Sequence, residues 1–163
     1  MASGKSYIGL KLAKALDYMF IDLDKYIEES EQENISNIFK NKGELYFRKK
    51  EHFYLNELLN KNEKIVLATG GGTPCYYNNM DLISNNKANS IYLRVSINTI
   101  VNRLKGEKSK RPLVAHLKTN EELIEFIGKH LFERNQFYNN AKLVVNANND
   151  ASLVVEEIIM NLF

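Results

Sequence analysis

The sequence predicts an α/β fold with three layers, in which helices cover both faces of a parallel sheet. Short apolar runs typical of buried strands alternate along the chain with segments whose apolar residues recur at helical spacing. Such alternation favours parallel strands that are covered on both sides. With 163 residues, 44% of them hydrophobic, the chain fits one domain with a substantial core, which we expect to span residues 1–163.

The first half of the chain predicts a helix, a strand, a second helix and a second strand. Apolar side chains recur at helical spacing in residues 5–16, which predicts an amphipathic helix. The apolar run at residues 19–21 ends at Asp22 and is typical of a short buried strand. We expect residues 25–39 to be mainly helical and residues 65–69 to form the second buried strand.

The second half continues the alternation. Thr73 and Pro74 are expected to supply an N-cap and a first-turn proline after the second strand. Residues 90–93 predict a third strand, and Ser96 is expected to cap the helix that follows it. Thr119 and Glu122 form a capping-box pattern. The remaining elements are expected to be a helix, a strand and a final helix, near residues 119–131, 143–145 and 155–162.

Composition and charge indicate which partners and which cellular compartment to expect for this protein. The net charge is +2 and the basic residues are spread along the chain apart from residues 105–111, so no nucleic-acid partner is expected. No apolar run approaches membrane-spanning length and no signal peptide heads the chain, so no membrane partner is expected. The single cysteine, Cys75, fits a reducing compartment. We therefore expect a cytoplasmic protein.

The N-terminal residues match part of a phosphate-binding loop. Gly4, Lys5 and Ser6 occupy the last three positions of the motif G-x-x-x-x-G-K-[ST], directly before an expected helix. In that motif backbone N–H groups surround the nucleotide phosphates, the lysine reaches the outer phosphates, and the hydroxyl ligates Mg²⁺. An ordinary helix start is the alternative. The opening glycine and its strand would lie before Met1, so we expect Met1 to be an interior residue of a longer loop.

Two acidic residues lie at the end of the first expected strand. Asp22 and Asp24 are two positions apart, which places both carboxylates on one face of an extended segment. Ligands of open parallel sheets collect at the carboxyl ends of the strands. One carboxylate there could serve Mg²⁺ while the other accepts a proton from a substrate hydroxyl. The alternative is that both are loop acids, with Asp24 capping the following helix.

Two further motifs suggest a substrate site. Residues 70–72 are three consecutive glycines after an apolar strand, which favours a close approach to the backbone over a flexible turn. Arg48 could bind a carboxylate while Glu51, one helical turn later, holds it, although a solvated helix pair is the alternative. Arg111 and Arg134, each taken alone, would be assigned to the surface.

Taken together, these motifs resemble the shikimate kinase family over essentially the whole chain. The motifs that carry the resemblance occur in the family's order: Gly4-Lys5-Ser6, Asp22-Leu23-Asp24, Ile38-Phe39, Gly43-Glu44-x-x-Phe47-Arg48-x-x-Glu51, Gly70-Gly71-Gly72, Arg111-Pro112-Leu113 and Arg134-x-x-x-Tyr138. The resemblance implies a P-loop kinase fold with a substrate-binding helical segment near residues 24–52 and a lid near residues 105–120. It also implies transfer of the γ-phosphoryl group of ATP to the 3-hydroxyl of shikimate.

The same resemblance implies a role for each matched position. The residues expected to be catalytic are Lys5, Asp24 and Arg111. Those expected to bind shikimate are Asp24, Arg48, Gly70, Gly71, Gly72 and Arg134, with Phe39, Phe47 and Glu51 around them. Those expected to bind the nucleotide are Ser3, Gly4, Lys5, Ser6, Arg103 and Arg111. Ser6 and Asp22 are expected to hold Mg²⁺, and ATP and shikimate are the expected substrates of a monomer.

The chain departs from the family pattern in its N-terminal loop and at two further places. Tyr7 replaces a small hydroxyl residue after Ser6, and residues 146–149 replace arginines that many members carry around the adenine. Two other readings therefore stay open. One is a different small-molecule P-loop kinase, of the gluconate or nucleoside-monophosphate type. The other is a nucleotide-binding module without catalytic activity.

Overall fold

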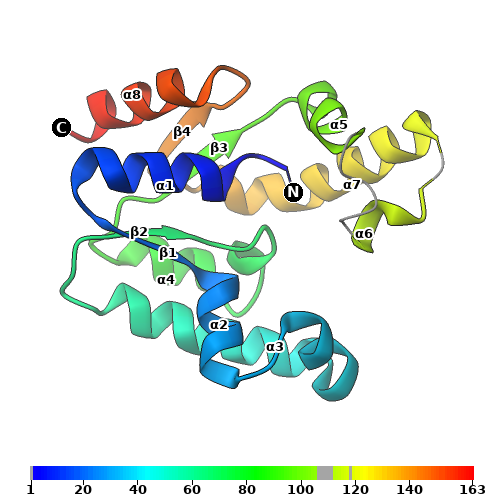
Figure 1. Cartoon of the computed structure of the whole chain (residues 1–163), viewed down its shortest axis with the longest axis horizontal. Coiled ribbons are helices and arrows are strands. Elements are labelled where there is room, and N and C mark those ends of the chain that lie inside the picture. The colour runs from blue at the N-terminus through cyan, green and yellow to red at the C-terminus, as the bar shows by residue number, and fades with distance from the viewer. Residues whose placement is uncertain (1, 106–111, 118) are drawn as a thin grey trace.

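The computed structural model describes residues 2–105, 112–117 and 119–163 (Figure 1). The strands in this part of the chain are β1 (Met19–Asp22), β2 (Ile65–Ala68), β3 (Ile91–Arg94) and β4 (Leu143–Asn146). The first helices are α1 (Lys5–Leu16), α2 (Leu23–Glu31), α3 (Ile35–Leu59), the 3₁₀ helix η1 (Thr73–Cys75) and α4 (Asn79–Asn85). The later helices are α5 (Ile97–Lys105), α6 (Pro112–Ala115), α7 (Asn120–Tyr138) and α8 (Ala151–Leu162).

All strands of the described residues are parallel, as expected, but they form two separate pairs. β1 pairs with β2, with Met19 opposite Ile65, and β3 pairs with β4, with Ile91 opposite Leu143. The expectation of one continuous sheet is therefore wrong for the described chain. β2 and β3 are not hydrogen-bonded to each other, and both line a cavity of about 1090 Å³. Helix α1 contacts β1, β2 and α8, and so connects the two halves (Figure 1).

The hydrophobic core is divided in the same way. One cluster lies among α1, α5, α7, β4 and α8, and its fully buried members include Leu104, Leu123, Val145 and Ile158. The other lies among α2, α3 and α4, and includes Leu23, Ile27, Ile38 and Leu55. Each fully buried Leu or Ile side chain contributes about 1.5–3 kcal/mol to stability through removal from water. The second cluster supports the segment that carries Phe47, Arg48 and Glu51.

The helix expected at residues 25–39 is two helices. α2 begins earlier, at Leu23, because the Asp22 carboxylate accepts a hydrogen bond from the backbone N–H of Asp24. It ends at Glu31, where Gln32 adopts a left-handed conformation with φ 54°. The side chain of Asn34 then caps α3. Local capping interactions therefore break a segment whose apolar pattern had suggested continuity.

Helix α3 bends at Gly43, whose φ of 82° and ψ of 170° are not helical. A residue with a side chain would be strained at this φ, so glycine is required at the bend. The first part of α3, which carries Phe39, ends at this glycine. The second part follows it and carries Glu44 and Arg48. The bend thereby sets the direction from which these side chains approach the rest of the molecule.

The carboxylate of Glu31 ties α2 to α3. It accepts hydrogen bonds of 2.6 Å from the hydroxyls of both Tyr46 and Tyr54, and it lies 2.8 Å from the ammonium of Lys50. Burial raises the pKa of this carboxyl, but the three donors outweigh it and lower the pKa to about 2. The α2–α3 unit is therefore held by a charged contact as well as by its apolar core.

The helix caps expected at Ser96 and Thr119 are confirmed. The Ser96 hydroxyl accepts from the N–H of Thr99, and Thr119 and Glu122 form a reciprocal capping box at the start of α7. Within residues 105–120, where the family resemblance implies a lid, the described residues include the short helix α6. Arg111, with the rest of 106–111, lies outside the described residues. No helix within the described ranges is both long and apolar enough to cross a bilayer.

Candidate active site

The start of α1 and the end of β1 meet at the N-terminal loop. Gly4 forms the N-cap of α1 with φ 86°, a conformation that favours glycine. Two residues later, the hydroxyl of Ser6 donates a 2.9 Å hydrogen bond to Oδ2 of Asp22. The guanidinium of Arg103 holds the loop from the other side, because it donates to the carbonyls of Ala2 (3.2 Å) and Ala147 (2.9 Å). The loop is thus fixed with the N-terminus of α1 open for an anion.

Asp22, and not Asp24, caps helix α2. Its Oδ1 accepts from the N–H of Asp24 at 3.1 Å while its Oδ2 accepts from Ser6. The prediction of two carboxylates on one face of a strand is therefore wrong in its geometry, because β1 ends at Asp22 and Asp24 lies in the first turn of a helix. The two carboxylates nevertheless act on each other, since the charge of Asp22 helps to raise the pKa of Asp24.

The carboxyl of Asp24 has a raised pKa. Burial raises it from 3.8 to about 6, with further contributions from the negative charges of Asp22 and Glu51, while the positive charge of Lys5 opposes the shift. Such a carboxylate is ionised at neutral pH yet has a higher proton affinity than an exposed aspartate. It is therefore suited to accept a proton from a hydroxyl group.

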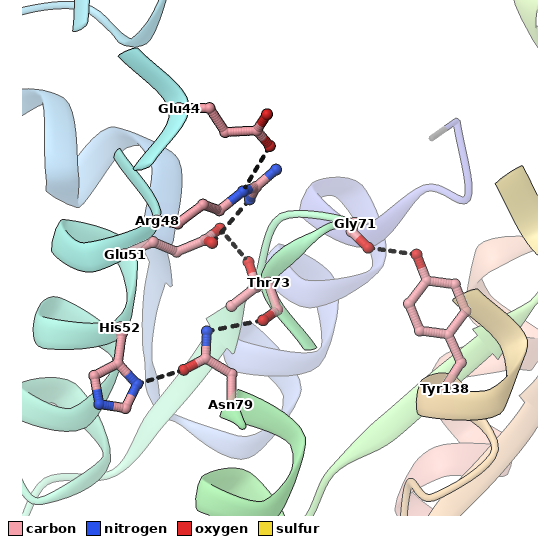
Figure 2. A network of polar contacts seen from close by, with 8 residues as sticks. All are labelled: Glu44, Arg48, Glu51, His52, Gly71, Thr73, Asn79 and Tyr138. Atoms are coloured by element: carbon pink, nitrogen blue, oxygen red, sulfur yellow. Dashed lines mark hydrogen bonds and ion pairs between the residues drawn. The ribbon is translucent and has the colours of Figure 1, made fainter. Parts of the chain in front are cut away.

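Arg48 is held in one orientation by four side chains. Its Nη1 lies 2.8 Å from Oε2 of Glu51 and its Nε lies 3.3 Å from Oε1 of Glu44 (Figure 2). The ring of Tyr76 lies 4.0 Å from the guanidinium carbon, and the ring of Phe47 lies 5.2 Å away. Because Glu51 is only 1% exposed, the solvated-pair interpretation of Arg48 and Glu51 is wrong.

Two phenylalanines expected to wall the pocket lie beside this arginine. The rings of Phe39 and Phe47 are in contact, with 4.8 Å between their centroids. Phe47 is buried, whereas Phe39 is 37% exposed and thus reaches the surface. The pair therefore forms an apolar wall that starts in the core and ends at the solvent.

The glycine loop after β2 packs against the charged side chains. A Cβ added to Gly70 would lie 3.3 Å from Oδ1 of Asp24 and 3.4 Å from Oε1 of Glu51. One added to Gly72 would lie 2.8 Å from Nη2 of Arg48. These distances favour close packing over the flexible-turn alternative, because a side chain at Gly70 or Gly72 would crowd Asp24, Glu51 or Arg48.

Thr73 has a different role from the one expected. Gly72 is the N-cap of η1, and the Thr73 hydroxyl instead donates a 2.6 Å hydrogen bond to Oε1 of Glu51. The carbonyl of Thr73 accepts from the Asn79 amide at 2.8 Å, and Asn79 in turn bonds to the ring of His52 at 2.7 Å (Figure 2). Sequence reasoning missed Asn79 and His52, since no local pattern marks a contact between segments more than twenty residues apart.

Tyr138 ties the far end of α7 to the glycine loop. Its hydroxyl donates a 2.5 Å hydrogen bond to the carbonyl of Gly71, and its ring packs on Tyr92 with 5.0 Å between centroids. Burial raises the pKa of Tyr138 while the nearby guanidinium of Arg134 opposes the shift. The only sequence signal for this residue was its place in the pattern Arg134-x-x-x-Tyr138.

The predicted residues of α7, the glycine loop and the N-terminal loop share one cavity. Its wall includes Ser3, Lys5, Gly70, Gly71 and Arg134. Burial raises the pKa of the Cys75 thiol and the positive charges of Arg134 and Arg48 both oppose this shift, so both guanidiniums lie near Cys75. The N-terminal loop thus contacts the end of β1 through Ser6 and Asp22, and α7 contacts the glycine loop through Tyr138.

The donor atoms of the N-terminal loop fit a hard cation. Ser6 and Asp22 present two oxygens 2.9 Å apart, and adjacent oxygens on an octahedral Mg²⁺ with bonds of about 2.1 Å are separated by about 3 Å. Within the described ranges, no cluster of three or more His, Cys, Asp or Glu side chains could hold a metal ion. A cation here would therefore take most of its ligands from water and from a nucleotide, as Mg²⁺ commonly does.

Comparison with known proteins identifies the family. A sequence model described as shikimate kinase matches residues 1–163. The chain belongs to the shikimate kinase family. A shikimate kinase of Flavobacterium psychrophilum is 44% identical over 164 residues, which cover 100% of this chain and 95% of that protein. The crystal structure of shikimate kinase from Bacteroides thetaiotaomicron, 34% identical, matches with a TM-score of 0.91 over 99% of this chain and 93% of its own.

A third comparison concerns a structure with bound substrate. Shikimate kinase from Acinetobacter baumannii, solved in complex with shikimate, is 28% identical and matches with a TM-score of 0.85 over 99% of this chain and 88% of its own. Family membership decides between the readings that the sequence left open. The chain is an enzyme with shikimate kinase activity and not a gluconate or nucleoside-monophosphate kinase or a noncatalytic module. Its strands and helices form the mixed α/β fold of that family.

Proposed function

We propose that the candidate active site transfers the γ-phosphoryl group of ATP to the 3-hydroxyl of shikimate in the cytoplasm, and that the chain acts as a monomer. The observation that carries the proposal is the fixed guanidinium of Arg48 beside the glycine loop and Asp24. A small polyol with one carboxylate needs a cation at one end and a proton acceptor at the hydroxyl that reacts. The contact of Gly70 with Asp24 and of Gly72 with Arg48 supports both needs within one loop.

In this proposal the substrate carboxylate binds between the two arginines. The hydrogen bonds of Arg48 to Glu44 and Glu51 use its Nε and Nη1. The guanidinium lies across Gly72, where Nη2, Nη1 and Cζ would be 2.8, 3.0 and 3.2 Å from an added Cβ, and Nη2 would donate to a substrate carboxylate. Arg134 would supply the second cation from α7. Phe39 and Phe47 would cover the apolar face of the ring.

Asp24 would bind the substrate hydroxyls and remove the proton of the 3-hydroxyl. Its raised pKa, about 6, suits this role because the carboxylate is ionised at neutral pH and still accepts a proton readily. In phosphoryl transfer most of the catalytic effect comes from positioning and charge stabilisation. Lys5 would stabilise the transferred charge, while the backbone of Ser3 and Gly4 would hold the phosphates.

Ser6 and Asp22 would hold Mg²⁺ together with the nucleotide. When bound, the ion would neutralise charge on the phosphates. The Ser6–Asp22 hydrogen bond keeps the two oxygens on the same side of the loop before any ligand arrives. Arg103, through its contacts with Ala2 and Ala147, would shape the adenine side. Arg111 would act from the segment outside the described residues, as the family resemblance implies.

The test measures steady-state kinetics with shikimate, gluconate and nucleoside monophosphates as acceptors, by coupled release of ADP. We expect turnover with shikimate alone. In Arg48→Ala we expect KM for shikimate to rise at least tenfold while KM for ATP stays within twofold. Lys49→Ala, an exposed neighbour on the same helix, is the matched control and should leave both constants unchanged. Equal changes in the two KM values would remove Arg48 from shikimate binding.

A further inference from the structure

We propose that Thr73 is a positioning residue that keeps Arg48 available to the substrate by limiting its ion pair with Glu51 to one oxygen. The inference rests on the proposed binding of the shikimate carboxylate by Arg48. Thr73 and Glu51 are nearly inaccessible to solvent, at 0% and 1% exposure, so their hydrogen bond has no competition from water.

The two oxygens of Glu51 have different partners. Oε2 lies 2.8 Å from Nη1 of Arg48, and Oε1 accepts the 2.6 Å hydrogen bond from the Thr73 hydroxyl (Figure 2). A free carboxylate and a guanidinium tend to pair through two parallel hydrogen bonds. Because Thr73 occupies Oε1, Glu51 offers Arg48 a single contact. The guanidinium thus stays across Gly72, with Nη2 left for the substrate carboxylate.

Thr73 is itself held by a closed ring of contacts. Its carbonyl accepts from the amide of Asn79, and the other end of that amide bonds to Nδ1 of His52. His52 follows Glu51 in α3, so the chain closes the ring through Glu51 and back to Thr73. Asn79 is fully buried. The ring therefore fixes the segment after the glycine loop to α3 at two adjacent residues, and the loop cannot shift relative to Arg48 without breaking it.

Removal of the Thr73 hydroxyl should change the hydrogen bonds of Arg48 while the fold is retained. Valine has nearly the shape of threonine and lacks the donor, so Thr73→Val leaves Oε1 of Glu51 without this partner. The carboxylate can then turn and take a second hydrogen bond from Arg48, which withdraws Nη2 from Gly72. Thr73→Ser retains the donor and should preserve the single contact.

The experiment measures shikimate binding and kinetics in the full chain. We expect Thr73→Val to raise both KM and Kd for shikimate about tenfold and to change KM for ATP less than twofold. We expect all of these constants in Thr73→Ser to stay within twofold of the parent. Thr99→Val on α5 is the matched control for loss of a threonine hydroxyl and should leave the shikimate constants unchanged. If Thr73→Val does not fold, Thr73→Ala replaces it with the same expectations.

A second ligand separates positioning from a general structural effect. For a shikimate analogue whose carboxylate is replaced by a hydroxymethyl group, we expect calorimetry to show less than twofold difference between Thr73→Val and the parent. Likewise, Thr73→Val should have no further effect on shikimate affinity in an Arg48→Ala background. Equal loss of affinity for both ligands, or failure of Thr73→Ser to restore binding, overturns the inference. Failure of the parent chain to bind shikimate would instead overturn the proposed function.

Discussion

Replacement of Asp24 by asparagine should greatly slow turnover and stabilise the protein at the same time. Burial and the charges of Asp22 and Glu51 disfavour the ionised carboxylate in the folded state, which is why its pKa rises from 3.8 to about 6. A neutral asparagine of the same shape avoids this cost. It cannot, however, accept the proton of a substrate hydroxyl, so kcat should fall by about 10²–10⁴.

The size of the stabilisation follows from the pKa shift. About two pKa units correspond to about 3 kcal/mol at most, and partial exposure of Asp24 reduces the expected gain to about 1–2 kcal/mol. The folded state binds the proton more strongly than the unfolded state, so the cost is absent below pH 3.8 and grows until the pH passes about 6. Asp24→Asn should thus gain stability at pH 7 to 8 and none near pH 3.8.

Urea unfolding at several pH values, with kcat measured in parallel, tests both parts. Asp81→Asn is the matched control, because Asp81 is an exposed acid in the first turn of α4, as Asp24 is in the first turn of α2. This control measures the loss of the favourable helix-dipole contact, which is worth about 0.3–1 kcal/mol. An Asp24→Asn enzyme with unchanged kcat would remove the residue from the mechanism. A stability difference independent of pH would refute the electrostatic reasoning.

Three further variants test other contacts of the candidate active site and of the α2–α3 unit. Gly72→Ala should displace the Arg48 guanidinium, since its Cβ would lie 2.8 Å from Nη2, and we expect at least a fivefold rise in KM for shikimate with little change in the thermal midpoint. Tyr138→Phe removes the donor to the carbonyl of Gly71, so unfolding by urea should show a loss of about 0.5–1.5 kcal/mol, and an unchanged midpoint would contradict the bond. Glu31→Gln should destabilise the chain by about 1–3 kcal/mol at pH 7, because the carboxylate bonds two tyrosines and a lysine. Because the pKa of Glu31 is lowered to about 2, this difference is fully present above pH 4.5 and should shrink as the pH falls toward 2; unfolding curves that show no such trend would contradict the assignment.

Features with local causes were the ones that sequence reasoning predicted well. The caps at Ser96 and Thr119 depend on atoms at most three residues away, and both are present in the structure. The apolar runs of the four strands are likewise local patterns, and each strand lies where it was expected. The break between α2 and α3 was missed because the capping side chain of Asn34 outweighs the apolar periodicity around it.

Features that depend on distant partners could not be predicted in the same way. Thr73 has the sequence context of an N-cap, yet its hydroxyl bonds to Glu51, 22 residues earlier in the chain. Glu51 and Arg48 have the spacing of a surface pair, and only the packing of α3 against the glycine loop shows that the pair is buried. The apolar runs of β2 and β3 also do not reveal that a cavity separates them.

The sequence by itself determined the family, the parallel α/β elements and the residue types available for phosphoryl transfer, because motif order and periodicity are properties of neighbouring positions. The tertiary structure decided which of these residues act on one another. It placed Asp24 beside Asp22 and Glu51 and so raised its pKa, and it directed Arg48 toward Gly72 through a carboxylate shared with Thr73. The physical reason is that electrostatic and hydrogen-bond energies depend on distance and burial, which exist only once the chain has folded.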